Sequence, residues 1–207
     1  FYRKPAISVL WAFLFAQFYN LANTYLVDKW LNSDCLKMLL TKDWFADQDK
    51  NELLLRSWQK LVDLMTELCG TPAGFIVQAG DEHYRVIIAN NSVENPYEAG
   101  TLIDSDINIF CREVVVKNKR LYIGNATQVD CWQSNPEVSA DGFNTYLGYP
   151  LHWPDGSIFG TICIMDFKIT EYGNRYDKLM THFRDMAERE LDLLYKNIQL
   201  ENTALRD

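Results

Sequence analysis

The residues of this sequence best suited to chemistry are its five cysteines, Cys35, Cys69, Cys111, Cys131 and Cys163. An odd number of cysteines without a CxxC pair is typical of reduced thiols in the cytoplasm rather than of a disulfide framework. A thiol is a good nucleophile only when its pKa is lowered and solvent reaches it. Cys163 stands between two isoleucines, so we expect it in the core, and we expect Cys111 there too. Cys131, in a polar segment, is the most exposed candidate for redox chemistry.

The three histidines, His83, His152 and His182, lie far apart in the sequence, without helical metal spacing and without a cysteine–histidine cluster. We therefore expect no metal site, no cofactor and no catalytic residue. A glycine-rich phosphate loop and a Gly-x-Ser-x-Gly nucleophile elbow are also absent from the sequence. The net charge of −8 argues against nucleic-acid binding, because phosphate contacts need a basic surface.

The elements that must position these residues follow from hydrophobic periodicity. Residues 51–69 repeat apolar side chains at helical spacing and stop at Gly70-Thr71-Pro72. Later, Pro154-Asp155-Gly156 is a clear turn between two apolar runs. The expected order is helix 51–69, strands 73–79 and 84–90, helix 106–117, strand 120–124, polar loop 125–144, strands 145–153 and 157–166, and helix 174–206. This order predicts an α+β fold with an antiparallel sheet rather than alternating βαβ units.

The run TYLGYPLHWPDGSIFGTICIMD, which begins at Thr145, resembles the closing hairpin of a GAF domain. The segments WQKLVDLMTELCGTPAGFIVQ and IFCREVVVKNKRLYIGNATQVDCWQSNPE are similar to the first helix and strand, and to the middle helix, strand and pocket loop, of that family. The resemblance covers residues 51–194 and is greatest to GAF domains that precede diguanylate cyclase or histidine kinase outputs in bacterial sensors. It implies a GAF/PAS-like central antiparallel sheet of about six strands, with N- and C-terminal helices packed on one face.

The same resemblance implies a sensory and regulatory module that dimerises, binds a small molecule in a pocket of the sheet and controls an output domain. This part of the protein would then not be an enzyme, while the output would be a diguanylate cyclase or a histidine kinase. Two alternatives stay open: a thiol-dependent reductase of free methionine sulfoxide with the same fold, and a purely structural dimerisation unit. The motifs for bilin attachment and for cyclic-nucleotide binding are not found.

The pocket that the resemblance implies lies between the sheet and the middle helix with its loop. An apolar site with a few polar groups is typical of small-ligand pockets. The alternative is that the same aromatic side chains only fill the core. The candidates for the ligand pocket are Phe75, Phe110, Cys111, Trp132, Tyr146 and Tyr149.

The last helix carries a repeat that is typical of a two-stranded coiled coil. Its repeated positions are spaced alternately by four and three residues: Ala187, Leu191, Leu194, Ile198, Glu201 and Leu205. We expect the first half of this helix to lie on its own domain and the part beyond Leu194 to meet a partner helix. Residues 195–207 would be a coiled-coil linker to an output domain. The candidates for a homodimer interface are Leu191, Leu194, Ile198 and Leu205.

Residues 5–27 contain no charged side chain and, as a helix, would be long enough to cross a membrane. Their polar residues Gln17, Asn20 and Thr24 share one helix face. Arg3 and Lys4 would lie on the wrong side of a span that enters the cytoplasm. We therefore favour residues 1–50 as an N-terminal helical segment of a dimer bundle, with a membrane-spanning or membrane-proximal helix as the alternative. The expected location is the cytoplasm, either free or attached to the inner membrane.

Overall fold

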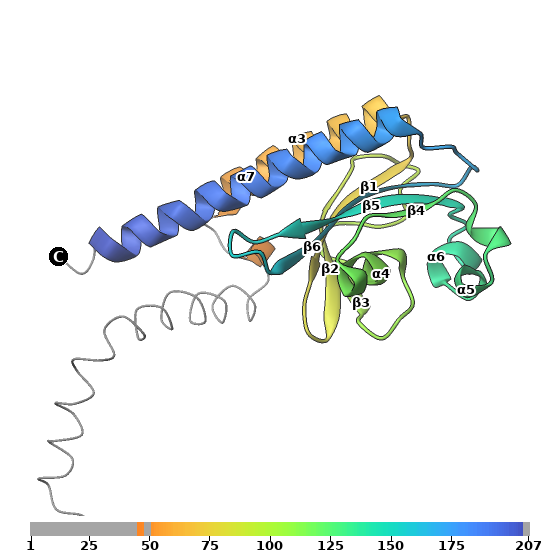
Figure 1. Cartoon of the computed structure of the whole chain (residues 1–207), viewed down its shortest axis with the longest axis horizontal. Coiled ribbons are helices and arrows are strands. Elements are labelled where there is room, and N and C mark those ends of the chain that lie inside the picture. The colour runs from red at the N-terminus through yellow and green to blue at the C-terminus, as the bar shows by residue number, and fades with distance from the viewer. Residues whose placement is uncertain (1–44, 48–50, 205–207) are drawn as a thin grey trace, which may run out of the picture. The chain divides into compact units, whose positions relative to one another are not determined.

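A computed structural model describes residues 45–47 and 51–204, within a compact unit that spans Trp44–Asp207. At the centre of this unit is a six-stranded antiparallel sheet with the strand order β3-β2-β1-β6-β5-β4 (Figure 1). The strands are β1 (Ala73–Ala79), β2 (His83–Ala89), β3 (Leu102–Asp104), β4 (Leu121–Ile123), β5 (Thr145–His152) and β6 (Ile158–Asp166). The predicted α+β fold with an antiparallel sheet is therefore confirmed.

Two long helices, α3 (Glu52–Cys69) and α7 (Asn174–Ala204), lie side by side on one face of the sheet (Figure 1). The helix α3 ends at Gly70, which adopts a left-handed conformation with φ 66° that a residue without a Cβ tolerates well. The helix α4 (Phe110–Lys117) lies on the other face. The prediction that the N- and C-terminal helices share one face is confirmed. The other helical segments within residues 45–47 and 51–204 are η1 (Phe45–Asp47), η3 (Ala126–Gln128), α5 (Asp130–Gln133) and α6 (Pro136–Ser139).

Three local predictions differ from the structure. The helix predicted over 106–117 begins only at Phe110, because Ile109 is extended and the preceding residues form a turn. The short edge strand β3 was not predicted, since three residues are too few to show an alternating pattern. The polar loop predicted over 125–144 contains η3, α5 and α6, each too short to show a helical period.

The domain begins earlier in the chain than the predicted boundary at residue 51. Phe45 is completely buried and stacks on Trp58, with the ring centroids 5.4 Å apart. Its backbone N–H donates to Oε1 of Gln78 at 2.9 Å, and its carbonyl accepts from Nδ2 of Asn51 at 2.9 Å. A single buried aromatic residue in a polar segment leaves no periodic signal, so the sequence placed Phe45 in the N-terminal segment 1–50.

Two of the expectations fall on residues that the structure does not describe. The uncharged stretch 5–27 and the interface candidate Leu205 lie outside the described residues. Among the helices that are described, none is both long enough and apolar enough to span a lipid bilayer. As far as residue 204, the predicted linker is a direct continuation of α7.

The sheet separates two hydrophobic cores, because successive side chains of a strand point to opposite faces. In β1, Ile76 joins the core under α3 and α7, while Phe75 and Val77 join the core under α4. In β5, Leu147 belongs to the first core and Tyr146 to the second. We refer to these as the helix-pair core and the α4 core.

We predict that Gly160 is essential for the close approach of the two central strands. A Cβ at this position would lie 1.9 Å from the carbonyl oxygen of Val77 in β1. Gly160→Ala must push β1 and β6 apart, so we expect the free energy of unfolding in urea to fall by about 1–3 kcal/mol. Gly173→Ala, where an added Cβ meets no atom within 4 Å, is the matched control and should not lower it. Equal stabilities of the two variants would contradict this account.

Candidate functional site

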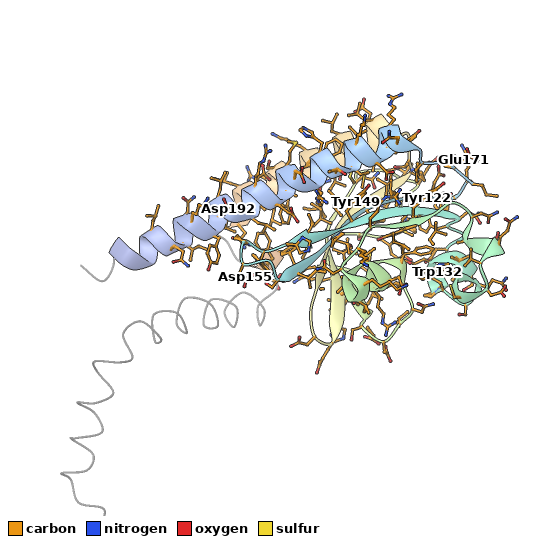
Figure 2. The ribbon with its side chains drawn as sticks, in the orientation of Figure 1. Tyr122, Trp132, Tyr149, Asp155, Glu171 and Asp192 are labelled. Atoms are coloured by element: carbon orange, nitrogen blue, oxygen red, sulfur yellow. The ribbon has the colours of Figure 1, made fainter. Side chains whose placement is uncertain are left out.

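The structure brings five of the six predicted pocket residues together and separates the sixth. Tyr149 lies in the helix-pair core, on the opposite face of the sheet from the others, and Figure 2 shows it apart from Trp132. It follows Tyr146 by three positions in an extended strand, and an odd separation reverses the face. The prediction that Tyr149 shares their pocket is therefore corrected. The five that lie together in the α4 core are Phe75, Phe110, Cys111, Trp132 and Tyr146.

Most of these five side chains fill the α4 core rather than line a cavity. The ring of Phe110 stacks on Tyr146 at a centroid distance of 4.9 Å and tilts against Trp132 at 4.8 Å. Only Phe75 and Cys111 of the five also border a small cavity of about 20 Å³, which is room for one water molecule. The full lining is Phe75, Val77, Val86, Tyr97, Ile103, Ile109, Cys111, Glu137 and Met165.

The carboxylate in this lining, Glu137, was not predicted as a site residue. Its place at the start of α6 is set by Asn135, whose Oδ1 accepts the Glu137 backbone N–H at 2.7 Å. Oε2 of Glu137 accepts from the backbone N–H of Phe110 at 2.8 Å and from Nδ2 of Asn135 at 3.2 Å. The sequence Asn135-Pro136-Glu137 signals a helix start, but nothing in it shows that the glutamate points inward.

The Glu137 side chain is 4% exposed, and no Lys, Arg or His among the described residues pairs with it. Burial disfavours the charged form and raises the pKa of Glu137 from 4.5 to about 7, although the two hydrogen bonds oppose this shift. The cavity therefore contains a carboxyl group that titrates near neutral pH.

The thiols of Cys111 and Cys163 meet beside this cavity. Their Sγ atoms are 3.7 Å apart, and Sγ of Cys111 lies 3.5 Å from the hydroxyl of Tyr146. Both cysteines are buried, in agreement with the prediction, and burial raises the pKa of Cys163 well above its usual value. A neutral, buried thiol is a poor nucleophile. Cys131 is exposed on α5, away from this pair.

One side of the cavity is closed by Tyr97, in the loop between β2 and β3. Its ring lies edge-on to Phe75 at a centroid distance of 5.8 Å and stacks on Phe143 at 6.3 Å. Its hydroxyl donates a hydrogen bond to Oδ2 of Asp141, just after α6. Burial and this carboxylate together raise the pKa of Tyr97. A single hydrogen bond thus ties the loop over the cavity to the α6 segment.

The end of α4 is connected to α7 by a first polar link through His152. Nε2 of His152 lies 2.8 Å from Oδ1 of Asn118, and its Nδ1 lies 2.9 Å from Oε1 of Glu188 on α7. The backbone N–H of His152 donates to the same Glu188 oxygen at 3.0 Å. Asn118 is the residue that ends α4, in a left-handed conformation with φ 48°. The link therefore runs from the last turn of α4 across β5 to α7.

A second polar link begins two residues later, at Arg120. Nε of Arg120 donates to Oδ1 of Asp177, in the first turn of α7, at 2.7 Å and to the hydroxyl of Tyr149 at 3.1 Å. The Tyr149 hydroxyl donates to the same Asp177 oxygen at 2.7 Å. The Tyr149 side chain therefore belongs to this second polar link and not to the predicted ligand pocket.

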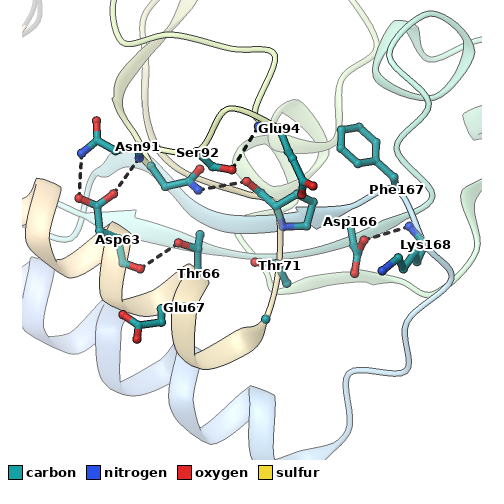
Figure 3. A pocket seen from close by; sticks show the side chains of 13 residues that line it. Asp63, Thr66, Glu67, Thr71, Asn91, Ser92, Glu94, Asp166, Phe167 and Lys168 are labelled. Atoms are coloured by element: carbon teal, nitrogen blue, oxygen red, sulfur yellow. Dashed lines mark hydrogen bonds between the residues drawn. The ribbon is translucent and has the colours of Figure 1, made fainter.

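A more open hollow of about 770 Å³ lies where α3 ends (Figure 3). Two of its carboxylates are engaged with the chain itself: Asp63 accepts from the backbone and side-chain amides of Asn91 at 2.8 and 2.9 Å, and Asp166 accepts from the Lys168 backbone at 2.9 Å. In the described part of the chain, no group of three or more His, Cys, Asp or Glu side chains could hold a metal ion.

Most of the described side chains in the coiled-coil seam predicted on α7 pack against the domain's own core. Ala187 and Leu191 are completely buried in the helix-pair core, and Leu194 packs against it. Ile198 is also buried. Leu191 is therefore corrected from an interface residue to a core residue. Among the side chains of α7 that the structure describes, three other large apolar ones are exposed, seven residues apart: Met186, Leu193 and Leu200, which are 39%, 59% and 68% exposed.

Comparison with known proteins agrees with this geometry. The sequence profile of the GAF domain matches residues 54–194. The chain belongs to the GAF domain family. It is also 22% identical over 163 residues to diguanylate cyclase DgcP of Escherichia coli (strain K12), in an alignment that covers 77% of this chain and 46% of DgcP. This GAF chain thus spans about half the length of that relative.

Solved GAF structures share the fold at low sequence identity. The GAF domain of a phosphoenolpyruvate-protein phosphotransferase from Acinetobacter has a TM-score of 0.56 and 11% identity, covering 70% of this chain and 86% of that one. The type II free methionine-R-sulfoxide reductase from Thermoplasma acidophilum has a TM-score of 0.55 and 14% identity, covering 69% and 95%. At such identities the similarity shows the fold alone.

We predict that Glu137 makes the stability of the domain depend on pH. Between its ordinary pKa of 4.5 and about 7, the unfolded chain has lost a proton that the folded chain still holds. Stability therefore falls as the pH rises through this interval and stays level above it. Each pKa unit corresponds to about 1.4 kcal/mol, so the loss is on the order of 3 kcal/mol.

The measurement is urea unfolding from pH 4.5 to 8, comparing the wild type with Glu137→Gln, in which this contribution should vanish. Glu67→Gln, at an exposed carboxylate of α3, is the control and should keep the wild-type profile. Parallel profiles for the wild type and Glu137→Gln would show that Glu137 is not the titrating group.

Proposed function

We propose that this chain is a regulatory GAF module in which occupancy of the cavity under α4 is transmitted to α7 and controls an output domain. The observation that carries the proposal is the pair of polar links from the end of α4 to α7, through His152 and through Arg120 with Tyr149. In this function the chain itself is not an enzyme.

The argument for transmission is geometric. Ile109, directly before α4, and Cys111 in its first turn border the cavity, and Asn118, the residue that ends α4, starts the first link to α7. A displacement of α4 that carries the following turn with it therefore moves α7 or breaks the Asn118–His152 contact and the hydrogen bond from Arg120 to Asp177. Partly exposed ion pairs of this kind contribute roughly 0.2–1 kcal/mol each, and two of them together are enough to bias a finely balanced two-state equilibrium. α7 extends past the β5–β6 hairpin, so a displacement of α7 also moves the part of the helix that lies beyond the sheet (Figure 1).

The output that best suits the similarity is a diguanylate cyclase, because DgcP is the curated relative described above. A histidine kinase is the second choice and rests only on the resemblance of the sequence. We further propose a cytoplasmic location, since the described cysteines are all free thiols. Residues 1–50 would join the dimer bundle or attach it to the inner membrane.

We predict that breaking the second link alters output. In a chimera in which this chain replaces the matching region of DgcP, Asp177→Asn weakens the ion pair with Arg120 and should change the rate of cyclic diguanylate synthesis by about threefold or more. Asp192→Asn, which breaks an ion pair with Lys196 within α7, is the matched control and should leave the rate unchanged. Equal rates for both variants and the wild type would indicate a purely structural spacer.

We also propose that the chain forms a homodimer through the exposed stripe of Met186, Leu193 and Leu200. Apolar residues that repeat every seven positions occupy one helix face and match the seam of a two-stranded coiled coil. Asn197 is also exposed, and it stands four residues after Leu193, where a polar residue in the seam favours one register. This stripe replaces the seam that contains Leu191.

Leu193→Glu is expected to convert this dimer to a monomer, because it places like charges opposite each other in the seam. Light scattering after size-exclusion chromatography gives the mass. Val116→Glu, at an exposed apolar position of α4 on the other face of the sheet, is the control and should remain dimeric. A dimer that survives Leu193→Glu would place the interface elsewhere.

The second candidate function is a thiol-dependent sulfoxide reductase, favoured by the 3.7 Å distance between the Cys111 and Cys163 sulfurs. In that reaction a sulfoxide would become a sulfide, its oxygen would leave as water, and the two thiols would be oxidised to a disulfide. Burial of both thiols opposes it. We expect no turnover of free methionine-R-sulfoxide by the reduced protein with dithiothreitol. Turnover that disappears in Cys111→Ser would establish the reductase instead.

A further inference from the structure

We infer that the cavity under α4 recognises a small organic amine, whose ammonium group pairs with Glu137 and whose apolar body lies against the surrounding hydrophobic wall. This inference rests on the proposed function, because it takes the cavity as the ligand site. It adds the chemical class of the ligand, which neither the fold nor the similar proteins specify.

The first step of the argument is the unmatched charge of Glu137. The carboxylate is almost completely buried, and no cationic side chain of the described residues pairs with it. Both hydrogen bonds that it accepts reach Oε2, from Phe110 and Asn135, and the described residues donate none to Oε1. Burying a carboxylate without a counter-charge is unfavourable. An ammonium group supplies both the missing charge and a donor for Oε1.

The second step is the composition of the cavity wall. Apart from Glu137, its lining carries no charged side chain. An anionic ligand, such as a phosphate or a nucleotide, would meet the negative charge of Glu137 in a medium that screens it poorly. The rest of the wall suits an aliphatic or aromatic body: Phe75, Val77, Val86, Ile103, Ile109 and Met165.

The third step is the size of the ligand and its way in. The cavity of about 20 Å³ admits only a water molecule while Tyr97 is in place. Tyr97 comes from a loop outside the sheet and is tied to Asp141 by its hydroxyl. Its ring lies between Phe75 and Phe143. If the loop swings outward, it leaves a space of one aromatic ring next to Glu137, so a ring-sized body is accommodated.

The fourth step links recognition to pH. An ammonium group binds the ionised form of Glu137, whose pKa in the empty cavity is about 7. At pH 8 the carboxylate is mostly ionised, whereas at pH 6 it is mostly protonated. Affinity for an amine should therefore rise by about tenfold from pH 6 to pH 8, while affinity for a neutral analogue should stay constant.

The test is calorimetric titration of the whole chain with 2-phenylethylamine and with its uncharged analogue 2-phenylethanol, at pH 6, 7 and 8. We expect the amine to bind at least about tenfold more tightly than the alcohol at pH 8, with the preference shrinking towards pH 6. Glu137→Gln should abolish the preference. Glu67→Gln, an exposed carboxylate on the opposite face, should keep it.

The other outcomes are equally decisive. Equal binding of amine and alcohol, unaffected by Glu137→Gln, would overturn the amine assignment and leave a ligand-binding regulatory module in place. Because the loop could hold the cavity shut, both probes are also titrated into Tyr97→Ala, and failure of the amine to bind that variant as well would overturn the inference. If Glu137→Gln does not fold, the pH dependence of the wild type still decides. The chimera described above tests transmission to the output separately.

Discussion

The alternation of side chains across the β1–β6–β5 strands is the constraint on which the rest of this domain depends. It divides the interior into a helix-pair core under α3 and α7 and an α4 core that contains the cavity. A ligand and the proposed output helix are therefore on opposite sides of a hydrogen-bonded sheet. The close approach at Gly160 makes this barrier tight, because the backbone of β6 touches that of β1 without room for a side chain.

Because the sheet separates the cavity from α7, the two polar links are the contacts through which we propose that the two sides communicate. Both start within the turn that joins α4 to β4, the last strand in the sheet order, and both end on α7. His152 of β5 stands between Asn118 and Glu188, and Tyr149 of β5 bonds both Arg120 and Asp177, which also meet directly. Packed apolar side chains accommodate small shifts without a directional response, whereas hydrogen bonds to Glu188 and Asp177 depend steeply on distance and angle. The coupling that we propose therefore resides in polar contacts around the sheet.

The α4 core combines tight apolar packing with a buried charged group. Its aromatic residues are packed tightly, yet it retains the carboxylate of Glu137 without a cation among the described residues. If folding stability were the only requirement, an apolar residue would serve better at this position than a buried carboxylate. The same unmatched charge explains both the expected loss of stability towards neutral pH and the preference that we infer for an amine. The empty domain loses free energy by burying this charge without a partner, and that loss is recovered when an ammonium group of the ligand pairs with the carboxylate.

The sequence by itself determined five of the six strands, the long terminal helices and the family, because these follow from periodicity over many residues and from the run around Pro154-Asp155-Gly156. It also placed Cys111 and Cys163 in the core. The tertiary structure alone decided that Glu137 points inward, that Tyr149 faces α7, and that Leu191 is buried while Leu193 is free. Each of these depends on which surface a neighbouring element covers, and a local pattern of a few residues contains no information about that neighbour.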